Sequence, residues 1–186
     1  CSSDLAPSRL SSITDPVSGR AITLRYNRPG DTCPTPPSGL GLDAAPPAAM
    51  LCQIAYPDGS TTDLAYQGGQ LARIVDPGAA VTQFAYTNGL LSGYRSPLVM
   101  DWIAQDPTSR AALPGTWANV TYDSPASTLS RVTHIQSPEP AGITATPSQR
   151  VGHTYAYDFT NPSVPKATVT VDGWSALVTA VEMDAT

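Results

Sequence analysis

A motif recurs along this chain at a spacing of about 20 residues, and it limits the possible folds more than any other feature of the sequence. The clearest copies cover residues 51–66 and 71–86, and less regular copies cover residues 10–26, 91–97 and 129–157. The residues that define the two clear copies are Leu51, Ile54, Gly59, Tyr66, Leu71, Ile74, Asp76, Gly78 and Tyr86. A unit this short buries its apolar side chains only by stacking on its neighbours, so we predict one continuous array of units.

Each clear copy has the pattern of a β-hairpin. In residues 61–66, Thr62, Leu64 and Tyr66 alternate with a second set of side chains, which predicts a strand with two different faces. The turns between strands contain Pro-x-Gly, Pro-Gly and Asn-Gly, whose residues favour tight turns. Leu71 and Ile74 are three residues apart, so either a β-bulge or burial on both faces must accommodate them. We therefore predict antiparallel hairpins that form a meander.

Composition supports a mainly β protein rich in turns. The 186 residues include 19 prolines and 14 glycines, and proline interrupts helices and central strands. One short helix is expected near 97–104, where Ser96 can act as the N-cap and Pro97 as the first helical residue. Turn residues are spread evenly, so residues 1–186 are interpreted as a single β-rich segment of a larger protein. The start at Cys1 suggests a cut from a longer chain or a processed product, and a lipid-modified cysteine is an alternative.

Two of the three cysteines enclose a proline-rich insertion at 33–50. A disulfide between Cys33 and Cys52 would stabilise the fold by about 3 kcal/mol because it restricts the unfolded chain. The alternative is a pair of unlinked thiols in a reducing compartment. The spacing matches no zinc motif, so no metal or cofactor is expected. The predicted bridge indicates a secreted or cell-surface location.

Residues typical of catalysis are sparse. His134 and His153 both fall in predicted strands without a nucleophile motif, so we interpret them as half-buried strand residues and expect no enzyme activity. The aromatic residues could form a sugar-binding surface, with Trp102, Trp117 and Trp174 as candidates, or a structural ladder along a sheet. The net charge of −5 argues against nucleic-acid binding, and no apolar stretch is long enough for a transmembrane segment.

The repeat resembles the unit of the Rhs or YD-repeat family, large secreted and surface proteins that include bacterial polymorphic toxins and the animal teneurins. The residues that carry the resemblance are Gly69, Leu71, Ile74, Asp76, Gly78, Thr82 and Tyr86, with a second match at Leu10, Ile13, Asp15, Gly19 and Tyr26. The Tyr-Asp pair of the family occurs at 122–123 and at 157–158, whereas other copies lack the aspartate. No Asp-Pro pair here is followed by x-Gly-Leu, the context of the family's self-cleavage site, so no catalytic aspartate is carried over.

The resemblance implies β-hairpins wound into a spiral shell that encloses a toxin or forms an adhesive surface. We therefore expect a non-enzymatic structural module whose partners are adjacent repeats of the same chain. The alternative is a free-standing β domain that binds a glycan or a cell-surface protein.

Overall fold

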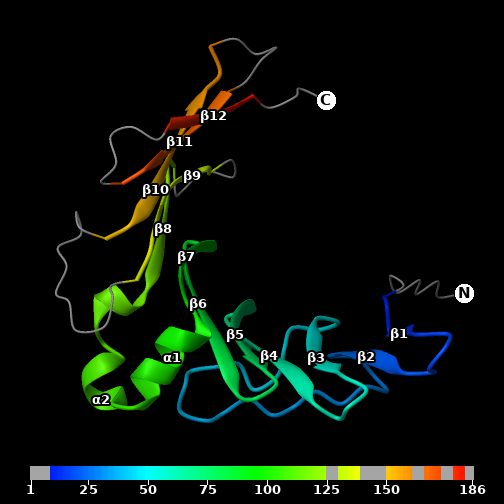
Figure 1. Ribbon diagram of the computed structural model, residues 1–186. Helices are drawn as coiled ribbons and strands as arrows, with labels where there is room; N and C mark the ends of the chain where they lie inside the picture. The colour runs from blue at the N-terminus through cyan, green and yellow to red at the C-terminus, as the bar shows by residue number, and fades with distance from the viewer. Residues whose placement is uncertain (1–8, 125–129, 139–149, 161–165, 173–177, 183–186) are drawn as a thin grey trace, which may run out of the picture. The chain divides into compact units, whose positions relative to one another are not determined.

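The computed structural model describes residues 9–124, 130–138, 150–160, 166–172 and 178–182. These residues are mainly β, and the strands pair antiparallel in chain order, which confirms the predicted meander (Figure 1). The strands are β1 (Ser12–Thr14), β2 (Ala21–Tyr26), β3 (Leu51–Ala55), β4 (Thr61–Gln67), β5 (Gln70–Asp76), β6 (Ala80–Thr87), β7 (Leu90–Arg95), β8 (Ala118–Tyr122), β9 (Val132–Gln136), β10 (Gly152–Asp158), β11 (Lys166–Val171) and β12 (Val178–Glu182). Three short helices lie between β7 and β8: α1 (Pro97–Ala104), α2 (Pro107–Arg110) and the 3-10 helix η1 (Pro114–Thr116). Contacts divide the chain into two compact units, Cys1–Gln83 and Phe84–Thr186.

Tight turns join the two strands of each hairpin in the first unit, whereas the proline-rich insertion joins β2 to β3. In the turn between β3 and β4, Gly59 has φ +85°, a value that favours glycine. The Asp58 carboxylate accepts hydrogen bonds from the backbone N–H and the hydroxyl of Ser60, at 3.0 and 2.7 Å. Gly78 has φ +82° in the turn between β5 and β6. The local chemistry of aspartate and glycine therefore fixes these hairpins, as predicted.

A β-bulge explains the three-residue spacing of Leu71 and Ile74. Ala65 pairs with Arg73 and Tyr66 pairs with Leu71, so Ala72 is the extra residue in β5. Ile74 is opposite Leu64, which is two residues from Tyr66 and so shares its face. Residues that are directly opposite each other project to the same face, so Leu71 and Ile74 both lie on the face of the repeat tyrosine.

The two faces of the first unit differ in chemistry. One face carries the repeat-defining apolar residues, as shown by the pairing of Leu24 with Ile54 and of Leu64 with Ile74. The other face carries polar residues that bond across the strands. Arg25 Nη1 donates to Gln53 Oε1 and Gln53 Nε2 donates to Asp63 Oδ1, each at 2.7 Å. Gln53 is buried, so these hydrogen bonds compensate for its lost hydration. Strand parity therefore gathers the apolar side chains on one face, where Thr62 and Asp76 bond to each other among them.

The second unit contains the predicted helix. α1 begins at Pro97, and Ser96 is its N-cap residue, although the Ser96 side chain makes no capping hydrogen bond. Asp106 caps α2 by accepting a hydrogen bond from Ser109 N at 3.2 Å. Among the described residues, no helix is long and apolar enough to cross a membrane.

A buried arginine holds the helical insertion against the strands that flank it. Arg95, the last residue of β7, donates from Nε and Nη2 to Thr116 Oγ1 at 3.0 and 2.6 Å. Its Nη2 also donates to the Ala111 carbonyl at 2.7 Å, and its guanidinium lies 4.0 Å from the ring centre of Trp117. Burial lowers the pKa of Arg95, because desolvation disfavours the charged form. The oxygen acceptors and the ring offset that desolvation.

Candidate functional site

The tyrosine that ends a repeat makes the same hydrogen bond in four places. In three of them the hydroxyl donates to the backbone carbonyl of the residue that begins the predicted copy. In the fourth the acceptor is Val132, so the copy predicted at 129–157 begins three residues later in the structure. The pairs are Tyr26 with Leu10 at 2.8 Å, Tyr66 with Leu51 at 2.7 Å, Tyr122 with Leu91 at 2.9 Å and Tyr157 with Val132 at 2.9 Å. In each hairpin the acceptor is one residue C-terminal to the position that the strand register places opposite the tyrosine. We call this arrangement the tyrosine node.

The backbone of the same tyrosine pairs forward with the start of the next repeat. Tyr26 pairs with Leu51, Tyr66 with Leu71 and Tyr122 with Val132, and a register shift immediately precedes the tyrosine in each case. The extra residues in the partner strands are Cys52, Ala72 and Thr133. Each of these tyrosines therefore joins three strands, because its hydroxyl bonds backward while its backbone pairs forward.

Two of the four node tyrosines are buried, whereas Tyr122 and Tyr157 are half-buried. Tyr66 is 3% exposed and Tyr26 is 9% exposed. The ladder between β3 and β4 ends at Gln53 and Asp63, so Leu51 lies beyond it and its carbonyl bonds to the Tyr66 hydroxyl. A buried phenol needs such a partner, and so does a buried carbonyl.

The remaining repeat-defining residues support the hairpins around the nodes. Asp76 Oδ1 accepts a hydrogen bond from Thr62 Oγ1 at 2.7 Å, and Thr62 Oγ1 lies 3.1 Å from the Tyr56 hydroxyl. Ile54 is opposite both Leu24 and Thr62 on the apolar face. Tyr86, which holds the tyrosine position of its repeat, is half-buried in β6, and burial raises the pKa of its phenol.

The repeat beginning at Leu91 was missed as a complete unit by sequence reasoning. The sequence predicts a copy at 91–97 that then breaks down. The hydrogen bond from Tyr122 to Leu91 shows that this copy continues after the helical insertion. The Tyr-Asp pair at 122–123 was the signal that could have identified its end.

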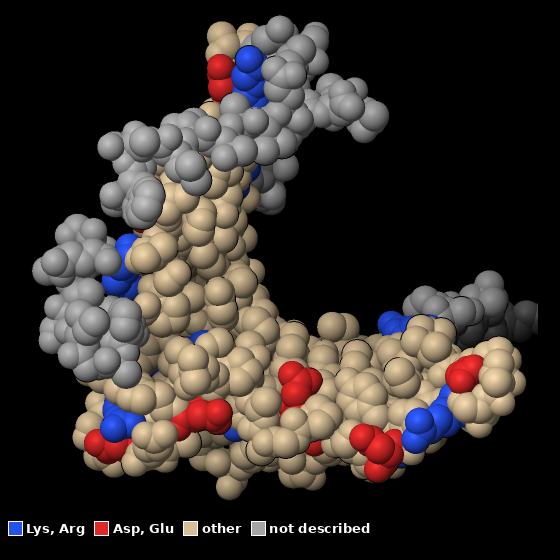
Figure 2. All heavy atoms as spheres, in the orientation of Figure 1, with Lys and Arg blue, Asp and Glu red and all other residues tan. Residues whose placement is uncertain are grey.

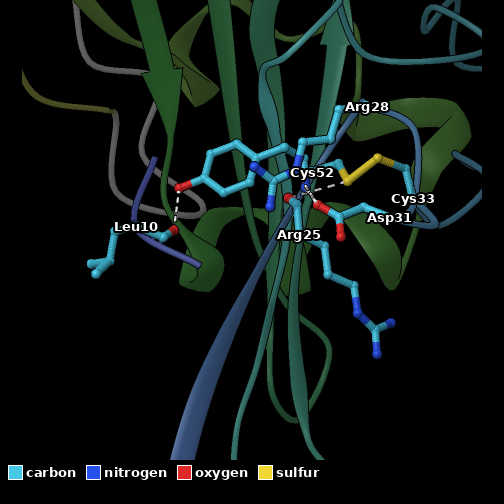
Figure 3. Close-up of polar contacts among 7 residues, drawn as sticks. Leu10, Arg25, Arg28, Asp31, Cys33 and Cys52 are labelled. Atoms are coloured by element: carbon cyan, nitrogen blue, oxygen red, sulfur yellow. Dashed lines mark hydrogen bonds and ion pairs between the residues drawn. A yellow bond between two sulfur atoms is a disulfide. The ribbon is translucent and has the colours of Figure 1, made fainter. Parts of the chain in front are cut away.

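The predicted disulfide between Cys33 and Cys52 is present (Figure 3). Cys52 is the bulge residue of β3 and is fully buried, with its sulfur 3.3 Å from the Arg25 carbonyl oxygen. Asp31 lies near the bridge and forms an ion pair with Arg28 at 2.8 Å. A hydrogen bond from the backbone N–H of Tyr26 is the main cause that lowers the pKa of Asp31.

The proline-rich insertion is fixed at two further points. The Asn27 side-chain amide donates to the Pro46 carbonyl. The two carboxylate oxygens of Asp43 accept the backbone N–H groups of Gly68 and Gly69, each at 3.0 Å. Asp43 therefore caps the turn that follows the Tyr66 node. The insertion is an ordered part of the repeat array and supports that node.

The histidines lie in strands, as predicted. His134 is half-buried, but His153 is exposed, so the prediction of two half-buried histidines is wrong for His153. His153 is opposite Ile135 and Val171 in the register, and the adjacent Thr154 is exposed as well, so both faces of β10 are exposed at this point. His134 Nε2 lies 2.5 Å from Asp172 Oδ2, and Thr154 Oγ1 donates to Asp172 Oδ1 at 3.1 Å. The bond from His134 is the main cause that lowers the pKa of Asp172.

The two described tryptophans each lie against an arginine. Arg95 covers Trp117, and the Arg110 guanidinium lies 4.4 Å from the ring centre of Trp102. Stacking of arginine on one ring face limits stacking by a sugar on that face. Trp174 lies outside the described residues.

One open pocket lies at the turn edge of the first unit. Its volume is 410 Å³, and its lining residues are Arg20, Tyr56, Pro57, Asp58, Ser60 and Pro77. Arg20 lies between β1 and β2, Pro77 lies between β5 and β6, and the other four residues lie between β3 and β4. An aromatic ring, prolines and a guanidinium are groups that contact sugars or extended peptides.

Neither the protein-family models nor the curated proteins contain a match to this sequence.

Proposed function

We propose that this chain is a non-enzymatic structural module of a protein of the Rhs or YD-repeat type. Its hairpins extend a β wall by pairing with adjoining repeats of the same kind. The wall belongs to a shell or scaffold of a secreted or cell-surface protein that delivers a toxin or mediates adhesion. The tyrosine node carries this proposal.

The node is suited to extension because the nodes at Tyr26, Tyr66 and Tyr122 each couple one repeat to the next. Tyr66 bonds backward to Leu51 through its hydroxyl and pairs forward with Leu71 through its backbone. The forward contact consists of hydrogen bonds between backbone groups of the two strands. It requires a bulge in the partner strand but no specific side chain there. An array of this kind can add units at its ends without a new type of interface.

The disulfide supports the proposed location. A bridge between Cys33 and Cys52 persists in an oxidising compartment, such as the cell exterior or the bacterial periplasm. The face shown in Figure 2 agrees with a scaffold role, because its acidic and basic side chains lie in small separate groups among uncharged ones. A wall of repeats needs no strongly charged patch.

The coding sequence on both sides of this segment tests the proposal. We expect further copies that begin with leucine and end with tyrosine at a period of about 20 residues. Flanks that contain only a signal peptide and a stop codon would contradict the structural role.

A second candidate function is glycan or cell-surface binding at the turn-edge pocket. Arg20 and Tyr56 provide a cation and a ring on the same pocket. A glycan array with the wild-type chain and with Tyr56→Ala and Arg20→Ala variants separates the two functions. Saturable binding that both substitutions abolish supports the binder, and an array without signal favours the wall.

A further inference from the structure

We infer that the outer edge of β1, which no described strand pairs with, accepts one additional antiparallel strand that ends in tyrosine, with this tyrosine opposite Leu10. This inference rests on the proposed function and names the partner of its N-terminal edge. The partner is a strand of the same repeat class with the pattern Thr-x-Leu-x-Tyr, as residues 62–66 show within this chain.

The first observation is the position of Leu10 in the repeat. Leu51, Leu71 and Val132 each begin a copy, and each pairs with the tyrosine of the preceding copy. Leu10 also begins a copy, because its carbonyl accepts the hydrogen bond of Tyr26. β1 is the first strand in the sheet order. β2 pairs with one side of β1, and no described strand lies beside Leu10 on the other side.

The second observation is exposure. Leu10 is 56% exposed and Ile13 is 55% exposed. The equivalent residues of the next repeat, Leu51 and Ile54, are half-buried between strands on both sides. A neighbouring strand would therefore cover two apolar side chains that this chain leaves in water.

The third observation is the direction of the backbone groups in β1. Leu24 N bonds to Ser11 O at 2.8 Å and Asp15 N bonds to Arg20 O at 2.9 Å, so Ser11 and Asp15 face β2. Hydrogen-bonding direction alternates along an antiparallel strand, so the N–H and C=O groups of Ser12 and Thr14 face outward. These are the groups that a further strand uses.

The edge can be tested with the full chain and a synthetic peptide. The probe is the acetylated and amidated peptide of residues 60–67, Ser-Thr-Thr-Asp-Leu-Ala-Tyr-Gln. We expect amide exchange of Ser12 and Thr14 in the full chain to slow by about 10-fold at saturating peptide, because pairing protects these groups. Nuclear Overhauser contacts between the peptide tyrosine and Leu10 are expected in the same sample.

Two variants at Thr14 test whether the peptide pairs with the outward backbone groups of β1. Thr14→Pro removes an outward N–H and leaves the bonds between β1 and β2 intact, so protection of Ser12 by the peptide should be lost. Thr14→Val keeps that N–H and should retain the protection. Unchanged exchange at Leu24 in both variants shows that the first hairpin is folded.

Three results would overturn the inference: no change at Ser12 and Thr14, protection that persists in Thr14→Pro, or equal binding of a peptide with alanine at the tyrosine position. These results are independent of the flanking-sequence test. Repeats in the flanks without peptide pairing would reject this register and leave the wall function standing. Peptide pairing without flanking repeats would reject the wall and leave the edge as an interface.

Discussion

The repeat at 51–66 and the repeat that begins at Leu91 form the same tyrosine node across very different connections. Tyr66 is 15 residues from its acceptor Leu51, and five residues, 56–60, join the two strands. Tyr122 is 31 residues from Leu91, and three short helices separate the strands. The hydroxyl-to-carbonyl distances are 2.7 and 2.9 Å. The node therefore depends on strand pairing near the repeat start and tolerates a large insertion at the opposite end.

The two connections are stabilised by different interactions. The tight turn depends on Asp58 and on the positive φ of Gly59. The helical connection depends on Arg95, whose buried side chain bonds to Thr116 and Ala111. Local sequence therefore fixes one connection, and a long-range buried cation fixes the other.

The largest expected effect comes from removal of the Arg95 side chain. Arg95→Ala breaks hydrogen bonds from a charged donor to two acceptors, each worth about 2 kcal/mol, so unfolding free energy should fall by about 4 kcal/mol. Arg95→Lys is the matched control, because it keeps the charge but loses the planar contact with Trp117. Urea denaturation followed by tryptophan fluorescence measures the change. A loss below about 1 kcal/mol would show that Arg95 does not hold the insertion.

The next largest effect comes from removal of the disulfide at the start of the repeat at 51–66. Replacing both Cys33 and Cys52 by alanine should lower the unfolding free energy by about 3 kcal/mol, because the loop between them gains freedom in the unfolded chain. Thermal unfolding with and without reductant provides the measurement. Thiol counting on the unreduced protein should label one of the three cysteines, and labelling of all three would exclude the bridge.

The nodes of the two repeats should contribute equally. Tyr66→Phe and Tyr122→Phe each remove one hydroxyl from a carbonyl partner, so each should cost about 1 kcal/mol of unfolding free energy. Tyr94→Phe, at a more exposed position outside the repeat tyrosines, is the matched control and should change little. Unequal losses at the two nodes, measured by urea denaturation, would contradict the equivalence of the repeats.

The smallest effect is a pH dependence that distinguishes the two repeat ends. Asp123 follows Tyr122, whereas Gln67 follows Tyr66. The backbone N–H of Arg131 and its side chain lower the pKa of Asp123 from 3.8. An aspartate whose pKa is lower in the folded than in the unfolded protein stabilises the fold at pH values above its unfolded pKa. This contribution is lost as the pH falls through the folded pKa.

Asp123→Asn should therefore reduce stability at neutral pH and flatten part of the loss below about pH 4. Asp101→Asn, at an exposed position in α1, is the matched control. Chemical denaturation between pH 2 and pH 7 makes this comparison. An unchanged pH profile in Asp123→Asn would show that the ion pair with Arg131 contributes nothing.

The sequence was sufficient for the local parts of the fold. The turns at 57–60 and 76–79 depend on proline, aspartate and glycine chemistry, and the helix at 97–104 depends on Pro97 at its first position. The bulge at Ala72 was one of two alternatives, and only the register between β4 and β5 decides between them.

Other features depend on contacts between distant residues. Asp43 caps the turn at Gly68 and Gly69, and no local pattern connects these positions. The role of Tyr122 was hidden because the helices separate it from Leu91. His134 meets Asp172 only because Gly152 lies between them, where any Cβ would collide with both side chains.

The register around one node tests the central claim most directly. In isotope-labelled protein, nuclear Overhauser contacts and couplings across hydrogen bonds can establish the pairing of β4 with β5. We predict that Tyr66 pairs with Leu71, that Ala65 pairs with Arg73, and that the Tyr66 ring contacts Leu51. A continuous ladder in which Ala65 pairs with Ala72, or a Tyr66 ring remote from Leu51, would contradict the tyrosine node.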